Sequence, residues 1–294
     1  MSPNRSPNNY IFLHVPKTAG SMFRSIVSNN FEELAAIENP LMSMQNYTAQ
    51  QIERLFYLYP YRFYQGHVFR LKESLKTRIP NLVLIAFVRE PISKALSSYY
   101  YLRQRDLTNP NHPTKHKSFC ELVDFFSKKS TCDSFDLDSS QLDWLVGKKN
   151  AKLDIVEEAV TNGKLLLFPT EKFDSACVVL EALFPNDFRD CSYHTKINTS
   201  KRPAEPPEEE TTAAGRLPWI ERDQKLHNYA QASLDELIAV AFKSPQDYEQ
   251  ALANFQKRCI APPPNDNAIN SKGGGDLSLL KRLRAAARVI IKGH

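Results

Sequence analysis

One continuous apolar run, residues 82–88 with the sequence LVLIAFV, constrains the fold of this chain more than any other feature. Consecutive apolar residues rich in Val, Leu and Ile are typical of a parallel strand that is covered on both faces. Arg89, Glu90 and Pro91 follow the run, and proline suits the first turn of a helix. The pattern therefore predicts a strand at 82–88 and a helix at 92–105.

Two further segments repeat this strand-to-helix order. Residues 11–15 (IFLHV) predict a short buried strand, followed by the loop PKTAGS and a helix from Met22. Residues 164–168 (KLLLF) predict another buried strand, with an amphipathic helix at 171–184. Strands that alternate with helices indicate an α/β fold with a mainly parallel sheet. Further helices are predicted at 48–58, 118–129, 138–146, 151–161, 223–242 and 245–257, with an aromatic-rich strand or turn at 61–69.

Composition divides the chain into four parts. Residues 1–9 are polar and are expected to form a flexible N-terminus, and residues 10–258 are expected to form one domain. Within that domain, the Pro-rich stretch at 195–218 predicts a long mobile loop. Residues 259–276 are rich in Pro and Gly and are expected to be a linker. Residues 277–294 predict a basic amphipathic helical tail.

The net charge and the targeting signals indicate where the protein is located and what it can bind. Residues 261–294 carry six basic and two acidic groups, or +4 of the total of +5, so the other 260 residues carry about +1. Such a body is not expected to bind nucleic acid, which needs clustered excess Lys and Arg. The chain begins with no apolar signal segment and has no apolar run of about 18 residues. We therefore expect a cytoplasmic protein, whose tail can bind an anionic membrane surface or a protein partner.

The loop after the first predicted strand, HVPKTAGS at 14–21, carries groups that bind anions. Lys17 supplies a point charge, Thr18 and Ser21 supply hydroxyls, and the small residues Ala19 and Gly20 let a phosphate approach a helix N-terminus. The order of a Walker A loop, G-x-x-x-x-G-K-[ST], is absent. On spacing alone, the segment fits either an anion-binding loop or an ordinary turn with an exposed lysine.

A second candidate site follows the strand at 82–88, because ligands of open α/β sheets bind at the carboxyl ends of the strands. Arg89 offers a planar fork that can bind a phosphate in a bidentate manner, and Ser97 lies further along the predicted helix. Taken alone, an arginine at this place is more often simply solvated. His67, in the sequence QGHV, is by itself more often a structural histidine beside aromatic residues.

Together, the segments HVPKTAGS, GHV and VREPISKALSSYYYLR resemble the sulfotransferases that use 3′-phosphoadenosine 5′-phosphosulfate (PAPS). The resemblance is strongest to the branch that contains the heparan and dermatan uronyl 2-O-sulfotransferases and their bacterial relatives. With weaker matches at 169–171 and 196–202, it extends from residue 10 to about 258. It implies the sulfotransferase fold, a P-loop-like α/β domain with a central mainly parallel sheet flanked by helices.

The resemblance also implies roles for individual residues. His67 corresponds to the catalytic base of the family, and Lys17 to a cation that faces developing negative charge. Arg89 and Ser97 correspond to a clamp for the 3′-phosphate, which would favour PAPS over ATP. Met22 stands where many members carry a second hydroxyl. The residues implied in cofactor binding are Lys17, Thr18, Ala19, Gly20, Ser21, Met22, Arg89, Ser97, Lys196, Ser200 and Lys201.

We therefore expect a PAPS-dependent sulfotransferase that acts on an acceptor hydroxyl by in-line displacement, without a metal ion. The near-neutral body favours a sugar, glycolipid or small metabolite as acceptor over a strongly anionic polymer. Two alternatives stay open. The first is a nucleotide-dependent phosphotransferase, against which the missing Walker A order and missing metal carboxylates argue. The second is a non-catalytic nucleotide-binding module, against which Lys17, His67 and Arg89 argue.

Overall fold

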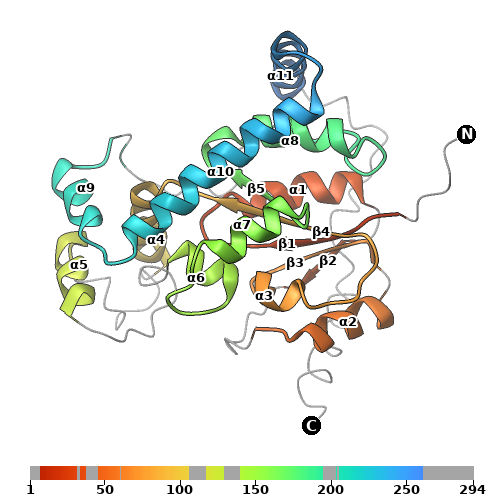
Figure 1. Cartoon of the computed structure of the whole chain (residues 1–294). Helices are drawn as coiled ribbons and strands as arrows, with labels where there is room; N and C mark the ends of the chain where they lie inside the picture. Colours follow the sequence, from red (N-terminus) through yellow and green to blue (C-terminus); the bar gives the residue numbers. More distant parts are fainter. Residues whose placement is uncertain are drawn as a thin grey trace, which may run out of the picture.

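The computed structural model describes residues 7–31, 34–37, 46–59, 61–105, 117–128, 140–194, 203 and 205–260. They contain a five-stranded sheet in the order β2-β3-β1-β4-β5, and every neighbouring pair is parallel (Figure 1). The strands are β1 (Asn9–Leu13), β2 (Leu34–Ile37), β3 (Phe63–Gly66), β4 (Leu82–Val88) and β5 (Leu165–Pro169). The expected α/β fold with a parallel central sheet is confirmed.

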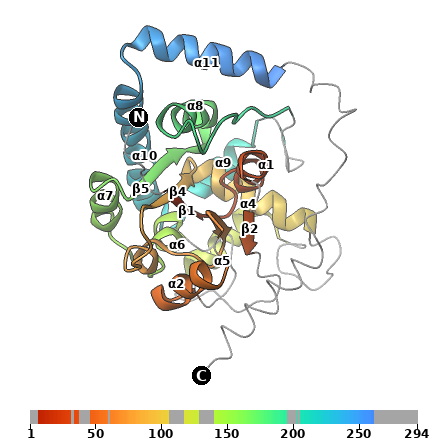
Figure 2. The same ribbon diagram turned by 90° about the vertical axis from the view of Figure 1, so that its right-hand side faces the viewer.

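Helices cover both faces of this sheet, and apolar side chains of β1, β3, β4 and β5 alternate between two apolar clusters, one on each face. Ile11 and Leu13 of β1 face one cluster, and Tyr10 and Phe12 face the other. The first face is covered by α2 (Ala49–Leu58), α3 (Leu71–Ser74), α6 (Gln141–Val146) and α7 (Asp154–Thr161). The opposite face is covered by α1 (Gly20–Asn30) and α8 (Phe173–Leu183), with α11 (Pro245–Ile260) outside α8 (Figures 1 and 2).

Helix α10 (Ile220–Ala241) lies beside the edge strand β5 and contributes to both clusters. Leu226 and Ala230 pack on the first face, and Leu234 packs on the second. The short 3₁₀ turn η3 (Thr170–Lys172) connects β5 to α8. This long helix therefore braces the strand ends on that side of the sheet, where the loops that follow β4 and β5 begin.

A third apolar cluster joins α4 (Pro91–Arg105), α5 (Phe119–Lys128) and α9 (Glu208–Gly215). Helix α9 corrects the prediction of a continuous mobile loop at 195–218. Ala213 and Ala214 are buried in the cluster, and Glu210 accepts a 2.6 Å hydrogen bond from the Tyr100 hydroxyl. Three glutamates occupy its first turn, where the helix dipole favours negative charge, so this acidic run starts a helix.

The remaining elements follow the predicted pattern with shifted ends. The strand at 82–88 is confirmed with the same bounds, whereas β1 ends at Leu13, so that His14 and Val15 lie in the following loop. Strand β2 and helix α3 were not predicted, and both are only four residues long. The helix predicted at 138–146 begins at Gln141.

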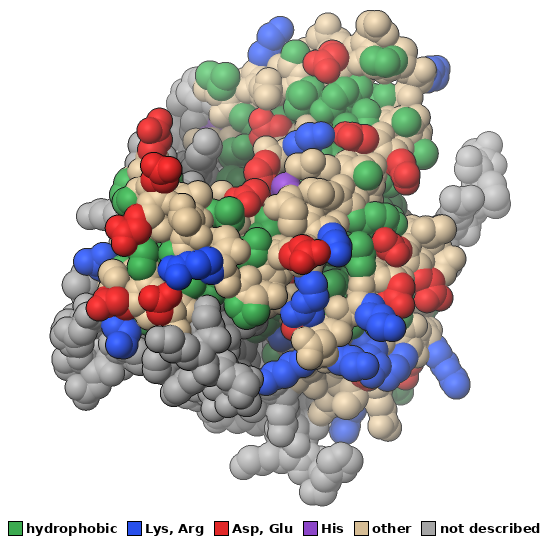
Figure 3. Space-filling view, turned by 60° about the vertical axis from the view of Figure 1, so that its left-hand side comes forward, with side chains coloured by type: hydrophobic (Ala, Val, Ile, Leu, Met, Phe, Trp, Pro, Cys, Tyr) green, Lys and Arg blue, Asp and Glu red, His purple; other side chains and the backbone are tan. Residues whose placement is uncertain are grey.

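Several predicted segments lie outside the described residues. They are the first six residues, the loop that carries Lys196, Ser200 and Lys201, most of the linker and the tail at 277–294. Within the described ranges, no helix is long and apolar enough to span a membrane. On the face shown in Figure 3, basic and acidic side chains are interspersed, with Lys and Arg more frequent toward its lower edge.

Candidate active site

The β1–α1 loop, residues 14–19, has an unusual backbone. Lys17 and Ala19 have φ angles of 66° and 61°, in the left-handed region that residues with a Cβ rarely adopt. The buried hydroxyl of Thr18 donates a 2.8 Å hydrogen bond to the Val15 carbonyl and closes the loop on itself. Two such conformations, separated only by Thr18, cost free energy, and strain of this kind clusters at functional sites.

The loop delivers the chain into helix α1. Ala19 is the N-cap, and its carbonyl accepts hydrogen bonds from the N–H groups of Met22 and Phe23, both at 3.0 Å. The first N–H groups of a helix have no intrahelical partner and favour an anion. Met22 itself packs against the apolar cluster on that face of the sheet, together with Ala19.

Gly20, the first residue of α1, is required by a close approach of the His14 ring. A Cβ at this position would lie 1.9 Å from Nε2 of His14 and 2.2 Å from its Cδ2. No side chain can occupy that space unless the imidazole moves. The sequence Ala19-Gly20 thus lets the helix N-terminus approach a histidine that lies directly after β1.

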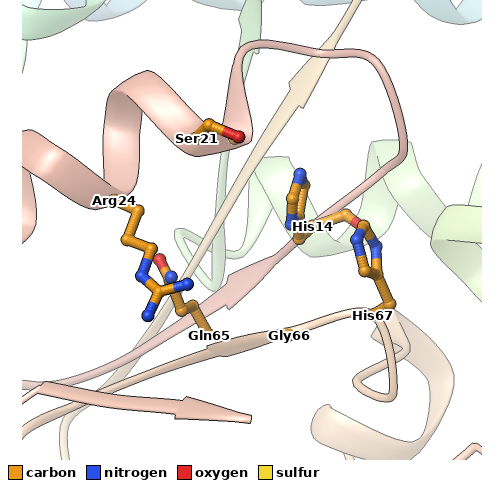
Figure 4. A pocket seen from close by; sticks show the side chains of 7 residues that line it. His14, Ser21, Arg24, Gln65, Gly66 and His67 are labelled. Carbon is orange, nitrogen blue, oxygen red and sulfur yellow. The ribbon is translucent and has the colours of Figure 1, made fainter. Parts of the chain in front are cut away.

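A cavity of about 240 Å³ opens in front of this helix N-terminus (Figure 4). Arg24 of α1 and Gln65 of β3 point toward one another across one side of it, and the two imidazoles stand on the other. Gln65 is only 4% exposed. The lining residues are His14, Gly20, Ser21, Arg24, Gln65, Gly66 and His67.

His67 follows the end of β3, and its ring contacts both His14 and Trp144. Its Nδ1 lies 2.8 Å from the carbonyl oxygen of His14, its ring stacks on the His14 ring at 4.0 Å, and the edge of Trp144 approaches at 5.9 Å. A carbonyl oxygen can only accept a hydrogen bond, so Nδ1 carries a proton, and in the neutral ring the lone pair lies on Nε2. This is the tautomer that a general base requires at Nε2.

His14 is held neutral beside it. Burial lowers the pKa of His14 well below its ordinary value, and electrostatic interactions with the neighbouring His67 and Arg24 lower it further. The ring also stacks on Phe12 at 5.3 Å, and the indole N–H of Trp144 donates to the His14 carbonyl at 3.2 Å. At neutral pH, His14 therefore adds no positive charge to the cavity.

Arg70 supports the turn that carries His67. Its guanidinium donates to the backbone carbonyl of His67 and, at 2.9 Å, to that of Phe69, and it lies 4.2 Å over the Trp144 ring. Burial lowers the pKa of Arg70 to about 9, which leaves the side chain charged at neutral pH. The charged side chain of Arg70 thus holds the turn after β3 in place.

The second predicted group lies on the neighbouring strand. Arg89 follows β4, and its Nη1 donates a 3.4 Å hydrogen bond to the carbonyl of Lys17, which joins the two strand ends. Ser97 is buried on α4, one turn before Tyr101. The Lys17 ammonium lies 3.8 Å above the centre of the Tyr101 ring. The β1–α1 loop therefore contacts both Arg89 and α4 through Lys17.

Five of the contributing residues had no predicted role: His14, Arg24, Gln65, Arg70 and Trp144. His14 and Gln65 belong to motifs that the sequence singles out, so their neighbourhood was flagged, whereas Arg24 and Trp144 carried no signal. In the described part of the chain, no group of three or more His, Cys, Asp or Glu side chains could hold a metal ion.

Comparison with known proteins gives consistent matches to one group of enzymes. The chain is 27% identical over 234 residues to heparan sulfate 2-O-sulfotransferase 1 of Xenopus laevis, which covers 69% of this chain and 64% of the relative. It is 28% and 29% identical over 199 residues to the proteins of that name from Mus musculus and Homo sapiens, which covers 61% of this chain and 55% of each relative.

No family model matches the chain. The matched regions span roughly three fifths of the length of the curated relatives. The motifs that resemble sulfotransferases also lie in the loops that meet at one edge of the sheet. The sequence matches show that this chain is related to the sulfotransferases.

Proposed function

We propose that the chain is a PAPS-dependent sulfotransferase that acts on a hydroxyl of a carbohydrate or small-molecule acceptor. One observation carries the proposal: the strained β1–α1 loop, His67 with its Nδ1 bonded to the His14 carbonyl, and Arg89 lie together at the carboxyl edge of one parallel sheet. Ligands of such sheets bind at this edge. The matches to heparan sulfate 2-O-sulfotransferases support the same class of reaction.

The residues of the loop fit the nucleotide. Gly20 and Ser21, at the N-terminus of α1, line the cavity, and the first N–H groups of a helix have no intrahelical partner, which suits a phosphate group. Lys17 and Ser21 would bind the 5′ end of PAPS, while Arg89 and Ser97 would bind its 3′-phosphate. PAPS would supply the sulfuryl group, whose bond to the 5′-phosphate oxygen breaks as the acceptor oxygen attacks sulfur.

The protein's own groups then perform two tasks. His67 Nε2 takes the proton of the acceptor hydroxyl, because its Nδ1–H is already held by the His14 carbonyl. Lys17 and the N–H groups at the start of α1 stabilise the negative charge that develops on the departing phosphate. Neutral His14 does not add a competing positive charge beside the base.

The acceptor is proposed from charge and from the relatives. Their name, heparan sulfate 2-O-sulfotransferase, points to a carbohydrate hydroxyl. The mixture of basic and acidic side chains in Figure 3, and the small net charge of residues 1–260, favour a neutral sugar, glycolipid or metabolite over a polyanion.

Calorimetric binding of adenosine 3′,5′-bisphosphate (PAP), with ATP as comparator, tests the proposal. We expect PAP to bind more tightly than ATP, and Lys17→Ala or Arg89→Ala to abolish that preference. Arg78→Ala, at an exposed arginine outside the site, is the control and should bind as the wild type does. If ATP binds as tightly as PAP, the phosphotransferase or binding-module alternative replaces this proposal.

The tail at 277–294 lies outside the described residues, and its role stays a prediction from the sequence. Its basic face and apolar face are expected to bind anionic lipid surfaces. Co-sedimentation with anionic liposomes, for the full chain and for a chain that ends at residue 276, checks this. Equal pelleting of the two chains would contradict the membrane role.

A further inference from the structure

The backbone at the end of β4 extends beyond its neighbours in the sheet. The β1 ladder reaches only Ile85 of β4, and the β5 ladder ends at the pair Val88–Pro169. Arg89 therefore follows the last paired residue. In a strand, the backbone N–H and C=O groups of successive residues point to opposite edges. Those of Arg89 therefore point toward the β1 side, where β1 no longer pairs with β4. Buried backbone groups in such a position need other partners.

Gln141 supplies both partners from its side chain. Its Oε1 accepts a 2.8 Å hydrogen bond from the Arg89 N–H, and its Nε2 donates a 2.7 Å hydrogen bond to the Arg89 carbonyl. A primary amide can donate and accept in this way, whereas a carboxylate lacks the donor and an apolar side chain lacks both groups. Gln141 is fully buried, so it binds Arg89 as a neighbouring strand would.

Gln141 is itself held at the start of α6. The carboxylate of Asp223 accepts hydrogen bonds from the N–H groups of Gln141 at 2.7 Å and Leu142 at 3.2 Å, and from the Ser140 hydroxyl at 2.5 Å. Asp223 is fully buried in α10. A carboxylate at a helix N-terminus is favoured by the helix dipole. The amide of Gln141 is therefore presented by a fixed helix end.

The other edge of the same backbone segment is held by side chains that follow β5. The Thr170 hydroxyl donates to the Val88 carbonyl at 2.9 Å, and the Glu171 carboxylate accepts from the Glu90 N–H at 2.9 Å. Side chains thus bind the backbone of three consecutive residues, Val88, Arg89 and Glu90. Val88 and Glu90 are bound on the β5 side and Arg89 on the opposite side.

One helix face supports both sides of this arrangement. His227 lies four residues after Asp223 on α10, which places the two side chains on the same face. His227 Nε2 lies 3.0 Å from the second oxygen of Glu171. One face of α10 thus supports the end of β4 on both edges. Asp223 holds Gln141 on one edge, and His227 contacts Glu171 on the other.

We propose that Gln141 is a positioning residue that sets the direction of the Arg89 guanidinium and thereby the preference for a nucleotide with a 3′-phosphate. This inference rests on the proposed function, in which Arg89 binds that phosphate. Bidentate binding requires the fork to lie within about 0.5 Å of its productive place. Arg89 also bonds to the Lys17 carbonyl, so a shift of its backbone would separate the fork from the β1–α1 loop.

The test compares Gln141→Met with the wild type by calorimetry, using PAP and adenosine 5′-monophosphate (AMP), which lacks the 3′-phosphate. Methionine keeps the size of the side chain but neither hydrogen bond. We expect the affinity for PAP to fall by roughly 10- to 100-fold, and the affinity for AMP to stay within about twofold, so that the PAP preference collapses. If Gln141 had a merely structural role, the variant would bind both PAP and AMP more weakly by a similar factor, and that result would overturn the proposal.

Two further variants keep the outcomes separate. Gln224→Met makes the same change beside Asp223, at a glutamine whose side chain donates a 2.8 Å hydrogen bond to Asn228, and should leave both affinities unchanged. Gln141→Asn retains a shorter amide and should recover part of the PAP preference; it also carries the test if Gln141→Met does not fold. Unchanged PAP binding in Gln141→Met, with loss in Arg89→Ala, would overturn this inference alone. A wild type that binds PAP no better than AMP would overturn the proposed function as well.

Discussion

The imidazole rings of His14 and His67 lie face to face, with their centres 4.0 Å apart and their planes 24° apart. The backbone carbonyl of His14 also accepts the hydrogen bond from Nδ1 of His67. The candidate base and the candidate phosphate-binding loop therefore share one residue, since His14 is the first residue of that loop. A displacement of His14 alters the base and the loop together.

Replacement of the candidate base should separate turnover from binding. His67→Ala is expected to lower kcat by roughly 10²- to 10⁴-fold, because no other group then takes the acceptor proton. PAP affinity should stay within about twofold, since the loop and Arg89 are intact. Turnover with PAPS and an acceptor from a hydroxyl screen, together with calorimetry, measures both.

His194→Ala is the matched control for that experiment, because His194 is exposed and does not line the cavity. It should keep full turnover. Full turnover in His67→Ala with normal PAP binding would show that another group is the base.

A methyl group at Gly20 should disturb the histidine pair. In Gly20→Ala, the new Cβ would lie 1.9 Å from His14 Nε2, so the ring must move. We expect the free energy of unfolding to fall by about 1–3 kcal/mol and PAP binding to weaken. Denaturant unfolding and calorimetry check the two effects.

Gly215→Ala is the control, because a Cβ there has no neighbour within 4 Å. It should be neutral or stabilise by up to about 1 kcal/mol. The His14→Ala background removes the clashing ring, so Gly20→Ala should cost less there. An equal cost in both backgrounds would exclude the His14 contact as the cause.

Stability should depend on pH through His14. Its pKa in the folded state lies well below the ordinary value of 6.5, chiefly because of burial. Between these two pKa values the unfolded chain binds more protons, so the free energy of unfolding decreases as the pH falls below 6.5. Above 6.5 both states are neutral and the contribution of His14 is fully present.

His14→Phe keeps an aromatic ring and removes the titrating group. Denaturant unfolding of both proteins between pH 5 and pH 8 should show a smaller loss of stability at acid pH in the variant. Parallel curves for the two proteins would exclude His14 as the source of the pH dependence.

Arg70 should contribute to stability through its fork. Arg70→Lys keeps the charge but cannot reproduce the two hydrogen bonds to the His67 and Phe69 carbonyls or the stacking on Trp144. We expect a loss of about 1–3 kcal/mol in the free energy of unfolding. The exposed Arg78→Lys should change it by no more than about 0.5 kcal/mol, and an equal effect at both positions would refute the role of the fork.

Local sequence patterns predicted the elements that carry the strongest signals. The apolar run at 82–88 forms β4 with the predicted bounds, because seven apolar residues in a row, of which the last five are buried, suit a covered strand. Local patterns failed for short elements, in which only a few residues determine the structure. The short strand β2 was missed, and α9 was predicted as loop because its Pro-rich surroundings hide Ala213 and Ala214, which pack against α4 and α5.

The sequence by itself determined the parallel α/β fold, the glycine-containing loop after β1, and the three motifs that resemble sulfotransferases. Only the tertiary structure decided how these parts act on one another. The bond from His67 to the His14 carbonyl spans 53 residues, and the two bonds from Gln141 to Arg89 span 52. Such contacts leave no local periodicity in the chain, because a buried polar group takes whichever partner the packing of distant elements brings within reach.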